Sequence, residues 1–401
     1  MRDDTQSVHP LFADVDFSEN LAPDHYERMA ALHARGERSA RVKLFGQPSV
    51  LVVGHRELSD MLGDDSSLPA KAAYQRASGA TLGHNLLTMA GDEHRITRAL
   101  VAAAFQPAAI RQLASSLLIP IAHEIVDGFS GRQEADLAQD YAHRYSFAVI
   151  TRMIGVPVED EIMFLDWLRL MFRYMYEPEA ATAAGNALAD YCRPILAQRR
   201  KEPRQDIISL LVHAEVEGRQ LDEDAIISFL RLLYPAGAET TFLSIGAVLY
   251  HVLVNPVLAE RCLASREYRA ALVEEVLRLS TATPIVPRYV ESETEIAGLK
   301  VSANSWVLLG IGAANHDPAV YQDPDALSVA DPPRHHLSFG RGPHFCIGTH
   351  LAREELQISL DILLRRLIGL RLEDAQKIER TGSFQQGIVK LPVLFDMVVP
   401  A

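Results

Sequence analysis

The sequence has few cysteines and no stretch that would separate it into independent parts. Its 401 residues include three cysteines, Cys192, Cys262 and Cys346, an odd number too small for a disulfide framework. No Gly/Ser-rich or Pro-rich linker and no internal repeat is present. Residues 1–19 are rich in acidic side chains and lack the apolar run of a signal peptide or a membrane span, so we expect a cytoplasmic protein without a membrane anchor.

Basic residues are outnumbered, and the motifs of common redox modules are missing. The chain has 39 Lys and Arg against 52 Asp and Glu, a net charge of −13, which argues against nucleic acid or an anionic membrane as the main partner. It has no Gly-x-Gly-x-x-Gly unit and no four-cysteine pattern, so we expect no flavin or ferredoxin module within it. Hydrophobic residues make up 48% of the chain, enough for a large core.

Apolar residues spaced three and four apart predict a mainly α fold with small β-sheets. We expect helices at residues 23–35, 92–105, 110–129, 136–154, 160–176, 180–200, 222–254, 271–279 and 351–370. Alternating stretches predict strands at residues 41–45, 49–53, 286–291, 295–301 and 391–399. Residues 64–88, rich in Ala, Gly and Ser, are interpreted as a mobile lid over a substrate.

One cysteine stands in a glycine-punctuated turn directly before a helical pattern. The stretch reads Phe339-Gly340-Arg341-Gly342-Pro343-His344-Phe345-Cys346-Ile347-Gly348. Glycines permit tight backbone turns, and the amides at a helix start favour a thiolate. Cys346 is therefore a candidate metal ligand. The alternative is that this cysteine serves only as a small buried apolar residue in a turn. Cys192 and Cys262 lie in helical patterns and are interpreted as inert packing residues.

The spacing Phe-Gly-x-Gly-x-His-x-Cys-x-Gly resembles the haem-binding loop of the cytochrome P-450 family. The resemblance implies haem b, iron protoporphyrin IX, with the Cys346 thiolate as axial ligand and with Phe339, Gly340 and Gly348 around the cofactor. It also implies a single domain over residues 1–401, with an N-terminal arm at 1–20 and a cysteine loop at 336–350. In that fold the haem lies between the long oxygen-activating helix and the helix that follows the cysteine loop.

Small residues interrupt the apolar stripe of the helix expected at residues 222–254. The run is Ala236-Gly237-Ala238-Glu239-Thr240-Thr241, and Leu232, Ala236 and Thr240 share one helix face. A mid-helix threonine can bond the carbonyl one turn back, so together with Pro235 we expect a loosened turn here. Buried threonines and small-residue helix contacts are also common in ordinary cores.

The same run resembles the oxygen-activating helix of the cytochrome P-450 family. The resemblance implies that Thr240 helps to hold dioxygen and a water molecule, while Glu239 helps to admit protons. Cleavage of the O–O bond with release of water requires two protons, which an apolar pocket supplies only through a relay.

Glu275 and Arg278 stand three apart and can pair on one helix face. Surface pairs of this kind are common and worth under about 1 kcal/mol. The segment resembles the Glu-x-x-Arg helix of the same family, which implies a buried brace beneath the cysteine loop. The chain departs from the family at His316 and Asp331, where many bacterial members have arginines. We expect that Arg334 or His316 substitutes, or that this corner is held together differently.

His94 and Arg98 are one helical turn apart and can bind one anion together. The resemblance implies that they bind the haem propionates together with Arg288 and His344, since guanidinium groups match carboxylates in geometry. The alternative is that the two residues belong to the solvated face of a helix and bind no cofactor.

These motifs together predict a haem-thiolate monooxygenase that inserts one oxygen atom from dioxygen into a small, mostly apolar organic substrate by hydroxylation or epoxidation. Because no electron-transfer module is expected in the chain, the electrons would come from a ferredoxin-type donor with its NAD(P)H-dependent reductase. The alternatives are a peroxide-driven or isomerising haem-thiolate enzyme and a non-catalytic haem-binding protein. Residues expected to line the substrate pocket are Leu82, Leu86, Leu232, Ala236, Thr283, Val286 and Phe384.

Overall fold

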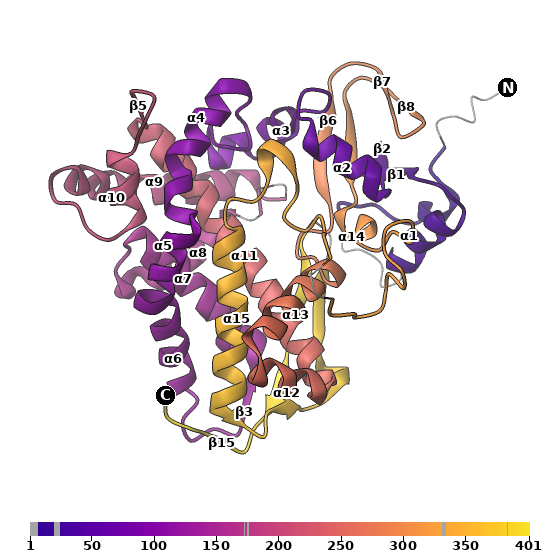
Figure 1. Cartoon of the computed structure of the whole chain (residues 1–401). Helices are drawn as coiled ribbons and strands as arrows, with labels where there is room; N and C mark the ends of the chain where they lie inside the picture. The colour runs from indigo at the N-terminus through magenta and orange to yellow at the C-terminus, as the bar shows by residue number, and fades with distance from the viewer. Residues whose placement is uncertain (1–6, 20–24, 172, 175, 331–333, 383) are drawn as a thin grey trace. The chain divides into compact units, whose positions relative to one another are not determined.

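The computed structural model describes residues 7–19, 25–171, 173–174, 176–330, 334–382 and 384–401. Packing divides the chain into two compact units, each built from segments that are distant in sequence. Unit 1 comprises Met1–Ala73, Ser265–Cys346 and Glu379–Val389, and unit 2 comprises Tyr74–Ala264, Ile347–Ile378 and Lys390–Ala401. The helices and strands are labelled in Figure 1.

Unit 1 is built on a four-stranded sheet. Its strand order is β1-β2-β9-β6, with β2 and β9 parallel and the other neighbours antiparallel. The helix α14 packs against α1 and α2. The elements of this unit are the 3₁₀ helices η2 (Pro10–Phe12) and η7 (Gly342–His344), α1 (His25–Ala34), β1 (Ser39–Leu44), β2 (Gln47–Val52), α2 (His55–Gly63), α13 (Arg266–Leu279), β6 (Val286–Val290), β7 (Thr294–Ile296), β8 (Leu299–Val301), β9 (Ser305–Leu309), α14 (Ile311–Ala314), β12 (Glu379–Gly382) and most of β13 (Gln386–Lys390).

The core of unit 1 lies on both faces of this sheet, because alternate strand residues point to opposite sides. One buried cluster gathers Val42, Leu44 and Leu308, and another gathers Val50 and Val307.

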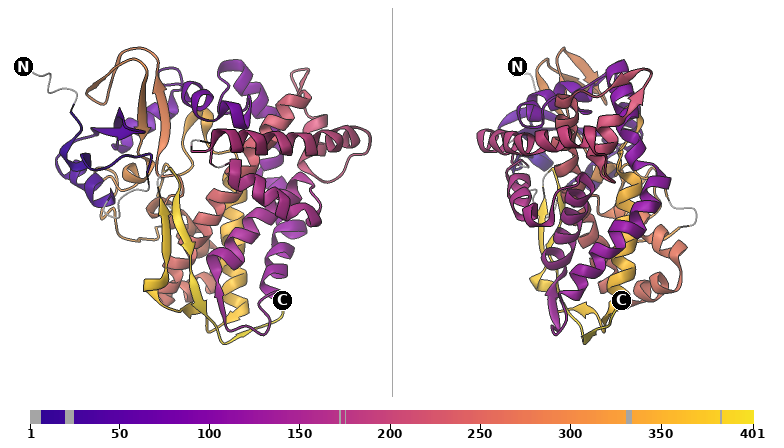
Figure 2. Two further views of the ribbon diagram at one scale, coloured as in Figure 1. Left: turned by 180° about the vertical axis from the view of Figure 1, so that it is seen from behind. Right: turned by 90° about the vertical axis from the view of Figure 1, so that its left-hand side faces the viewer.

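Unit 2 is mainly helical. Its helices are most of α3 (Ala70–Leu82), α4 (Gly91–Ala102), α5 (Pro107–Leu113), α6 (Ile119–Asp127), α7 (Arg144–Ile154), α8 (Glu161–Met171), α9 (Pro178–Lys201), α10 (Ile207–His213), α11 (Glu223–Val254), α12 (Pro256–Ala264) and α15 (Thr349–Arg366). Its short strands are β3 (Glu134–Asp136), β4 (Glu215–Val216), β5 (Arg219–Gln220), β10 (Leu367–Ile368), β11 (Arg371–Leu372), β14 (Pro392–Leu394) and β15 (Met397–Val398). The C-terminus lies at the end of unit 2 that carries β3 and β15, which are labelled in Figure 1 and seen from two further sides in Figure 2.

The 32-residue helix α11 is the centre of unit 2 and contacts α7, α9 and α15. By length and composition it could cross a membrane, but 61% of its most apolar window is buried inside the protein. Burial on most sides is what makes a core helix apolar around its whole circumference. The apolarity of α11 is therefore explained by packing.

Several expected helices differ from the observed ones. The helix expected at 110–129 is divided by a π-helical segment at Ala114–Leu118, and the one expected at 136–154 begins with another at Leu137–His143. The helix expected at 351–370 ends at Arg366, because the next residues pair with β15 as strand β10. The lid predicted at 64–88 contains α3, which the sequence analysis did not foresee. The boundaries predicted for the domain, the N-terminal arm and the lid stay predictions.

Candidate active site

Glycine turns place Cys346 in a tight loop of unit 1. Gly340 and Gly342 have φ angles of +69° and +70°, in the left-handed region that residues with a Cβ adopt only at a cost. The amide of Cys346 closes the turn by donating to the Phe339 carbonyl at 2.8 Å. These glycines are thus required by the backbone path that carries the cysteine.

The three cysteines differ in exposure. Cys192 and Cys262 are buried, whereas Cys346 is partly exposed. Burial raises the pKa of the Cys192 thiol to about 12, so this residue is protonated at neutral pH. The helix α15 begins shortly after Cys346 in the chain, with Gly348 as its N-cap. Among the cysteines, Cys346 is therefore the one suited to bind a metal as a thiolate.

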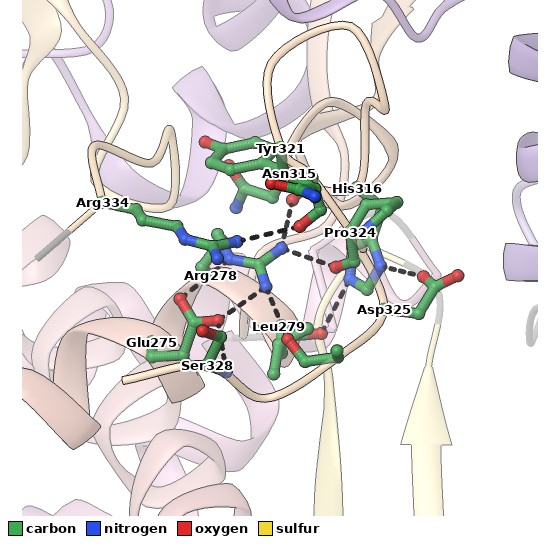
Figure 3. A network of polar contacts seen from close by, with 12 residues as sticks. Glu275, Arg278, Leu279, Asn315, His316, Tyr321, Pro324, Asp325, Ser328 and Arg334 are labelled. Carbon is green, nitrogen blue, oxygen red and sulfur yellow. Dashed lines mark hydrogen bonds and ion pairs between the residues drawn. The ribbon is translucent and has the colours of Figure 1, made fainter. Parts of the chain in front are cut away.

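Arg278 is fully buried and uses all of its N–H groups. Nε and Nη2 donate to the Glu275 carboxylate at 3.0 and 2.7 Å. Nη1 donates to the carbonyls of Asn315 and Pro324, and Nη2 also donates to that of Ala326 (Figure 3). Glu275 is 3% exposed and Arg278 0%. A buried ion pair is tolerated when its hydrogen-bonding groups are matched in this way.

Asn315 connects this pair, which we call the brace, to the start of the cysteine loop. Its backbone carbonyl accepts from Arg278, and its side-chain oxygen accepts from the Leu337 amide at 2.8 Å. Its amide nitrogen donates to Ser338 Oγ at 2.8 Å, and that hydroxyl donates to the Leu277 carbonyl. A continuous set of hydrogen bonds thus fixes the start of the cysteine loop to α13.

Neither candidate takes the place of the arginines that many family members have. His316 Nδ1 lies 2.7 Å from Asp325 Oδ1, and its Nε2 lies 3.1 Å from the Leu279 carbonyl. Arg334 donates to the Gln322 carbonyl at 3.4 Å (Figure 3). These contacts do not reach the side chains of Glu275 or Arg278, so of the three alternatives expected for this corner they favour the third, that it is held together differently.

The corner is held by the backbone instead. Glu275 Oε1 accepts a hydrogen bond from the Ser328 amide at 3.0 Å, in addition to the one from Arg278. A backbone donor carries no charge and needs no particular side chain, which explains why sequence could not identify it. Asp331 lies outside the described residues.

Thr240 lies on the least buried face of α11 in unit 2. Ala236 is exposed and Leu232 and Thr240 are partly exposed, whereas most of the rest of this helix is buried. Thr240 Oγ1 donates to the Ala236 carbonyl at 2.7 Å. The helix continues through Pro235 without a break, and the threonine bonds the carbonyl one turn back as expected. The loosened turn itself stays a prediction.

Gly237 serves helix packing. A Cβ at this position would lie 2.5 Å from Ile150 Cδ1 of α7, closer than real side-chain atoms approach. The small residue at this position is thus explained by the close approach of α11 and α7.

Glu239 is an unusually weak acid on the same helix. Burial raises its pKa to about 7, and the positive charge of Arg169 opposes this shift. A carboxyl group with such a pKa can both release and accept a proton near neutral pH.

The four residues expected to bind carboxylates lie in different units. His94 is buried and Arg98 is partly exposed, one turn apart on α4 of unit 2. Arg288 is 3% exposed on β6 of unit 1. His344 belongs to the cysteine loop, and its Nε2 lies 3.2 Å from Asp65 Oδ2, a contact that sequence reasoning missed. Their joint binding of one cofactor stays a prediction.

A buried carboxyl group of unit 2 was also missed. Glu355 of α15 is 0% exposed, and neither carboxyl oxygen has a hydrogen-bond partner among the described residues. Burial raises its pKa well above the usual range. The neighbouring Tyr141 and Tyr145 are stacked and fully buried. Helical spacing could have found this residue, because it follows Leu351 by four positions on the buried face of α15.

Known proteins resemble this chain over almost its whole length. The family model described as Cytochrome P450 matches residues 150–397. Mycinamicin IV hydroxylase/epoxidase of Micromonospora griseorubida is 33% identical over 362 residues, 88% of this chain and 90% of the relative. Nocardicin C N-oxygenase of Nocardia uniformis subsp. tsuyamanensis is 32% identical over 393 residues, 94% of this chain and 97% of the relative.

A solved structure agrees with these relatives. The cytochrome P450 PksS of the Bacillus subtilis 168 bacillaene polyketide synthase has a TM-score of 0.86 and 29% identity, covering 94% of this chain and 98% of that one. The chain belongs to the cytochrome P450 family.

Membership of the cytochrome P450 family confirms the predicted mainly α fold, the class of monooxygenase and the cofactor, haem b held by a cysteine thiolate. A P450 monooxygenase uses an organic substrate, dioxygen and a redox partner. The donor groups of unit 1 fit the cofactor, because they include a partly exposed cysteine on a fixed loop and the buried cation Arg288.

The residues predicted to line the substrate pocket are divided between the units. Leu82 and Leu86 are buried in unit 2, which also contains Leu232 and Ala236. Thr283, Val286 and Phe384 are partly buried in unit 1. Their assembly into one pocket stays a prediction.

Proposed function

We propose that this cytochrome P450 inserts one oxygen atom from dioxygen into a small, mostly apolar organic molecule, with Cys346 as the iron ligand. The observation that carries the proposal is the partly exposed Cys346 in a loop fixed by left-handed glycines and by the brace. Bound haem with a thiolate ligand supplies the redox chemistry, since the electron-rich sulfur favours cleavage of the O–O bond. The residues of the chain bind the cofactor, orient the substrate and deliver protons.

Glu239 and Thr240 are the proposed proton-delivery residues. The pKa of Glu239, about 7, allows its carboxyl oxygens to release a proton and be reprotonated at neutral pH. The Thr240 hydroxyl already donates its hydrogen to the Ala236 carbonyl, which leaves the oxygen lone pairs to accept a hydrogen bond. Glu239 would therefore supply the protons that dioxygen cleavage requires, while the Thr240 oxygen would hold the water molecule that passes them on.

The proposed carboxylate-binding residues are His94, Arg98, Arg288 and His344. A buried guanidinium such as that of Arg288 is stabilised by an anion, and its planar donors match a carboxylate. Phe339, Gly340 and Gly348 would shape the loop around the cofactor. The substrate would contact the apolar residues of the predicted pocket.

The proposed electron donor is a ferredoxin-type protein with its NAD(P)H-dependent reductase, since the sequence has no dinucleotide or iron–sulfur motif. The acidic chain and the burial of α11 support a cytoplasmic location. Relatives named for mycinamicin IV and nocardicin C suggest natural products as the first compounds for a substrate screen.

The test is the absorption spectrum of the reduced protein with carbon monoxide. We expect the band of thiolate-ligated haem in the wild type and its loss in Cys346→Ser. Cys192→Ser and Cys262→Ser are the controls and should keep the band, because both side chains are buried. A wild type without the band, or a Cys346→Ser variant that keeps it, would contradict the assignment.

A second measurement distinguishes the mode of turnover. With a substrate found by optical titration, we compare product formed with reductant and dioxygen against product formed with hydrogen peroxide alone. The proposal expects the first condition to be required for efficient turnover. Equal turnover with peroxide alone would favour the peroxide-driven alternative.

A further inference from the structure

The cysteine loop has a second attachment in unit 1, independent of the brace. Arg341 Nη1 donates to the Ser59 hydroxyl on α2. A Cβ at Gly342 would lie 2.4 Å from the Leu62 carbonyl oxygen, so the loop backbone packs directly on the last turn of α2. The third contact is between His344 and Asp65, at 3.2 Å. The segment from α2 to the start of α3 therefore fixes one side of this loop.

Asp65 is the residue of this segment that joins three parts of unit 1. Its Oδ2 faces His344 Nε2, while its Oδ1 accepts from the Ala70 amide at 2.8 Å, at the first residue of α3. The Asp65 and His344 side chains are only 15% and 10% exposed. The positive charge of Arg288 also acts on this carboxylate.

The carboxylate is ionised although its side chain is only 15% exposed. Burial alone would raise the pKa of Asp65, but the hydrogen bonds from His344 and Ala70 and the charges of His344 and Arg288 lower it below the usual value. An ionised carboxylate can only accept hydrogen bonds, so His344 Nε2 is the donor in this contact. With Nε2 held in this way, the orientation of the imidazole ring is fixed and Nδ1 points away from Asp65.

We propose that Asp65 is a positioning residue of the haem site, which orients the His344 ring toward the carboxylates of the cofactor. The proposal rests on the proposed function, because it requires His344 to face bound haem. Partners that orient a binding side chain by a hydrogen bond affect affinity strongly in metal sites. The same contact connects the cysteine loop to the first turn of α3, within the segment predicted as a lid.

The competing explanation is that Asp65 only caps α3. Asp65→Asn separates the two roles, because the asparagine oxygen can still accept from the Ala70 amide. Its amide nitrogen, a donor, would then face His344 Nε2, so the charge-assisted hydrogen bond from the ring to an ionised carboxylate is lost. Asp65→Ala removes both contacts. The matched control is Asp64→Asn, which changes an exposed neighbour bonded to Ser66.

The experiment measures the rate at which haem leaves the holoprotein for an excess of apomyoglobin. We expect Asp65→Asn and Asp65→Ala to lose haem about five- to tenfold faster than the wild type, the effect of one charge-assisted hydrogen bond in a partly exposed site. Asp64→Asn should stay within about twofold. Resonance Raman bands of the haem propionates should shift in both Asp65 variants.

A double mutant tests whether the effect passes through His344. His344→Gln should release haem at least as fast as Asp65→Asn, and the combined variant should release it no faster than His344→Gln, because Asp65 acts only through the His344 ring. Release at the wild-type rate from Asp65→Asn, with faster release only from Asp65→Ala, would show that capping of α3 is the role and would overturn the proposal. Additive effects in the double mutant would overturn it as well.

The failure of this proposal is distinguishable from the failure of the proposed function. A wild-type protein without the thiolate carbon monoxide band would remove the basis of both. A wild type with the band, whose Asp65→Asn variant keeps its haem and its Raman spectrum, would overturn only the role of Asp65.

Discussion

Replacing Glu275 by glutamine should destabilise the protein more than any nearby charge change. The variant keeps the shape of the side chain but removes the negative charge that faces Arg278, whose exposure is 0%. Removing one partner of a buried pair leaves the other charge uncompensated, at a cost of about 3–5 kcal/mol. The new side-chain NH₂ group is itself a donor. It would face another donor, either the Arg278 guanidinium or the Ser328 amide. Against a typical total of about 5–15 kcal/mol, this is a large loss.

The assay is urea unfolding of the holoprotein, followed by circular dichroism and by haem absorption. The matched control is Glu274→Gln, because the Glu274 side chain is 16% exposed and lies 3.4 Å from His336. We expect the control to change the free energy of unfolding by less than about 1 kcal/mol. The reasoning is refuted if the free energy of unfolding of Glu275→Gln is also within about 1 kcal/mol of the wild-type value. A buried guanidinium that has lost its counter-ion should destabilise the folded protein by more than that.

Three further variants test other parts of the site. Glu239→Gln should lower turnover with dioxygen and remove the decline expected above pH about 7 in the wild type, where the carboxyl loses its proton; an unchanged pH profile would contradict the relay. The pKa of Glu355 is raised in the folded protein, so the folded protein keeps a proton that the unfolded chain loses, and its stability falls as pH rises above the pKa of an unfolded glutamate. Glu355→Gln should reduce this dependence of the free energy of unfolding on pH, measured by urea unfolding between about pH 5 and 8. The same pH dependence in the variant and the wild type would contradict the prediction. Gly342→Ala should destabilise the holoprotein much more than Gly340→Ala, because both have positive φ but only at Gly342 would a Cβ lie 2.4 Å from a carbonyl oxygen; equal losses of free energy of unfolding would contradict this packing.

Local patterns in the sequence determined much of this protein. The helix expected at 222–254 is observed at Glu223–Val254, since apolar spacing and the capping Asp222 are properties of neighbouring residues. The glycine turn around Cys346 was also predictable from the sequence, because few residues other than glycine adopt a left-handed backbone conformation. The same loop carried the resemblance that identified the family and its cofactor.

The tertiary structure decided which partners these residues have. His344 meets Asp65 across 279 positions of the chain, and Glu275 takes the backbone amide of Ser328 across 53. It also ended α15 at Arg366, where strand pairing overrides helical spacing. Contacts of this kind depend on how distant segments pack. A hydrogen bond from a backbone amide cannot be predicted from the sequence, because every residue except proline has such an amide. Periodicity therefore predicted the elements, while long-range packing alone determined the hydrogen bonds that hold the cysteine loop.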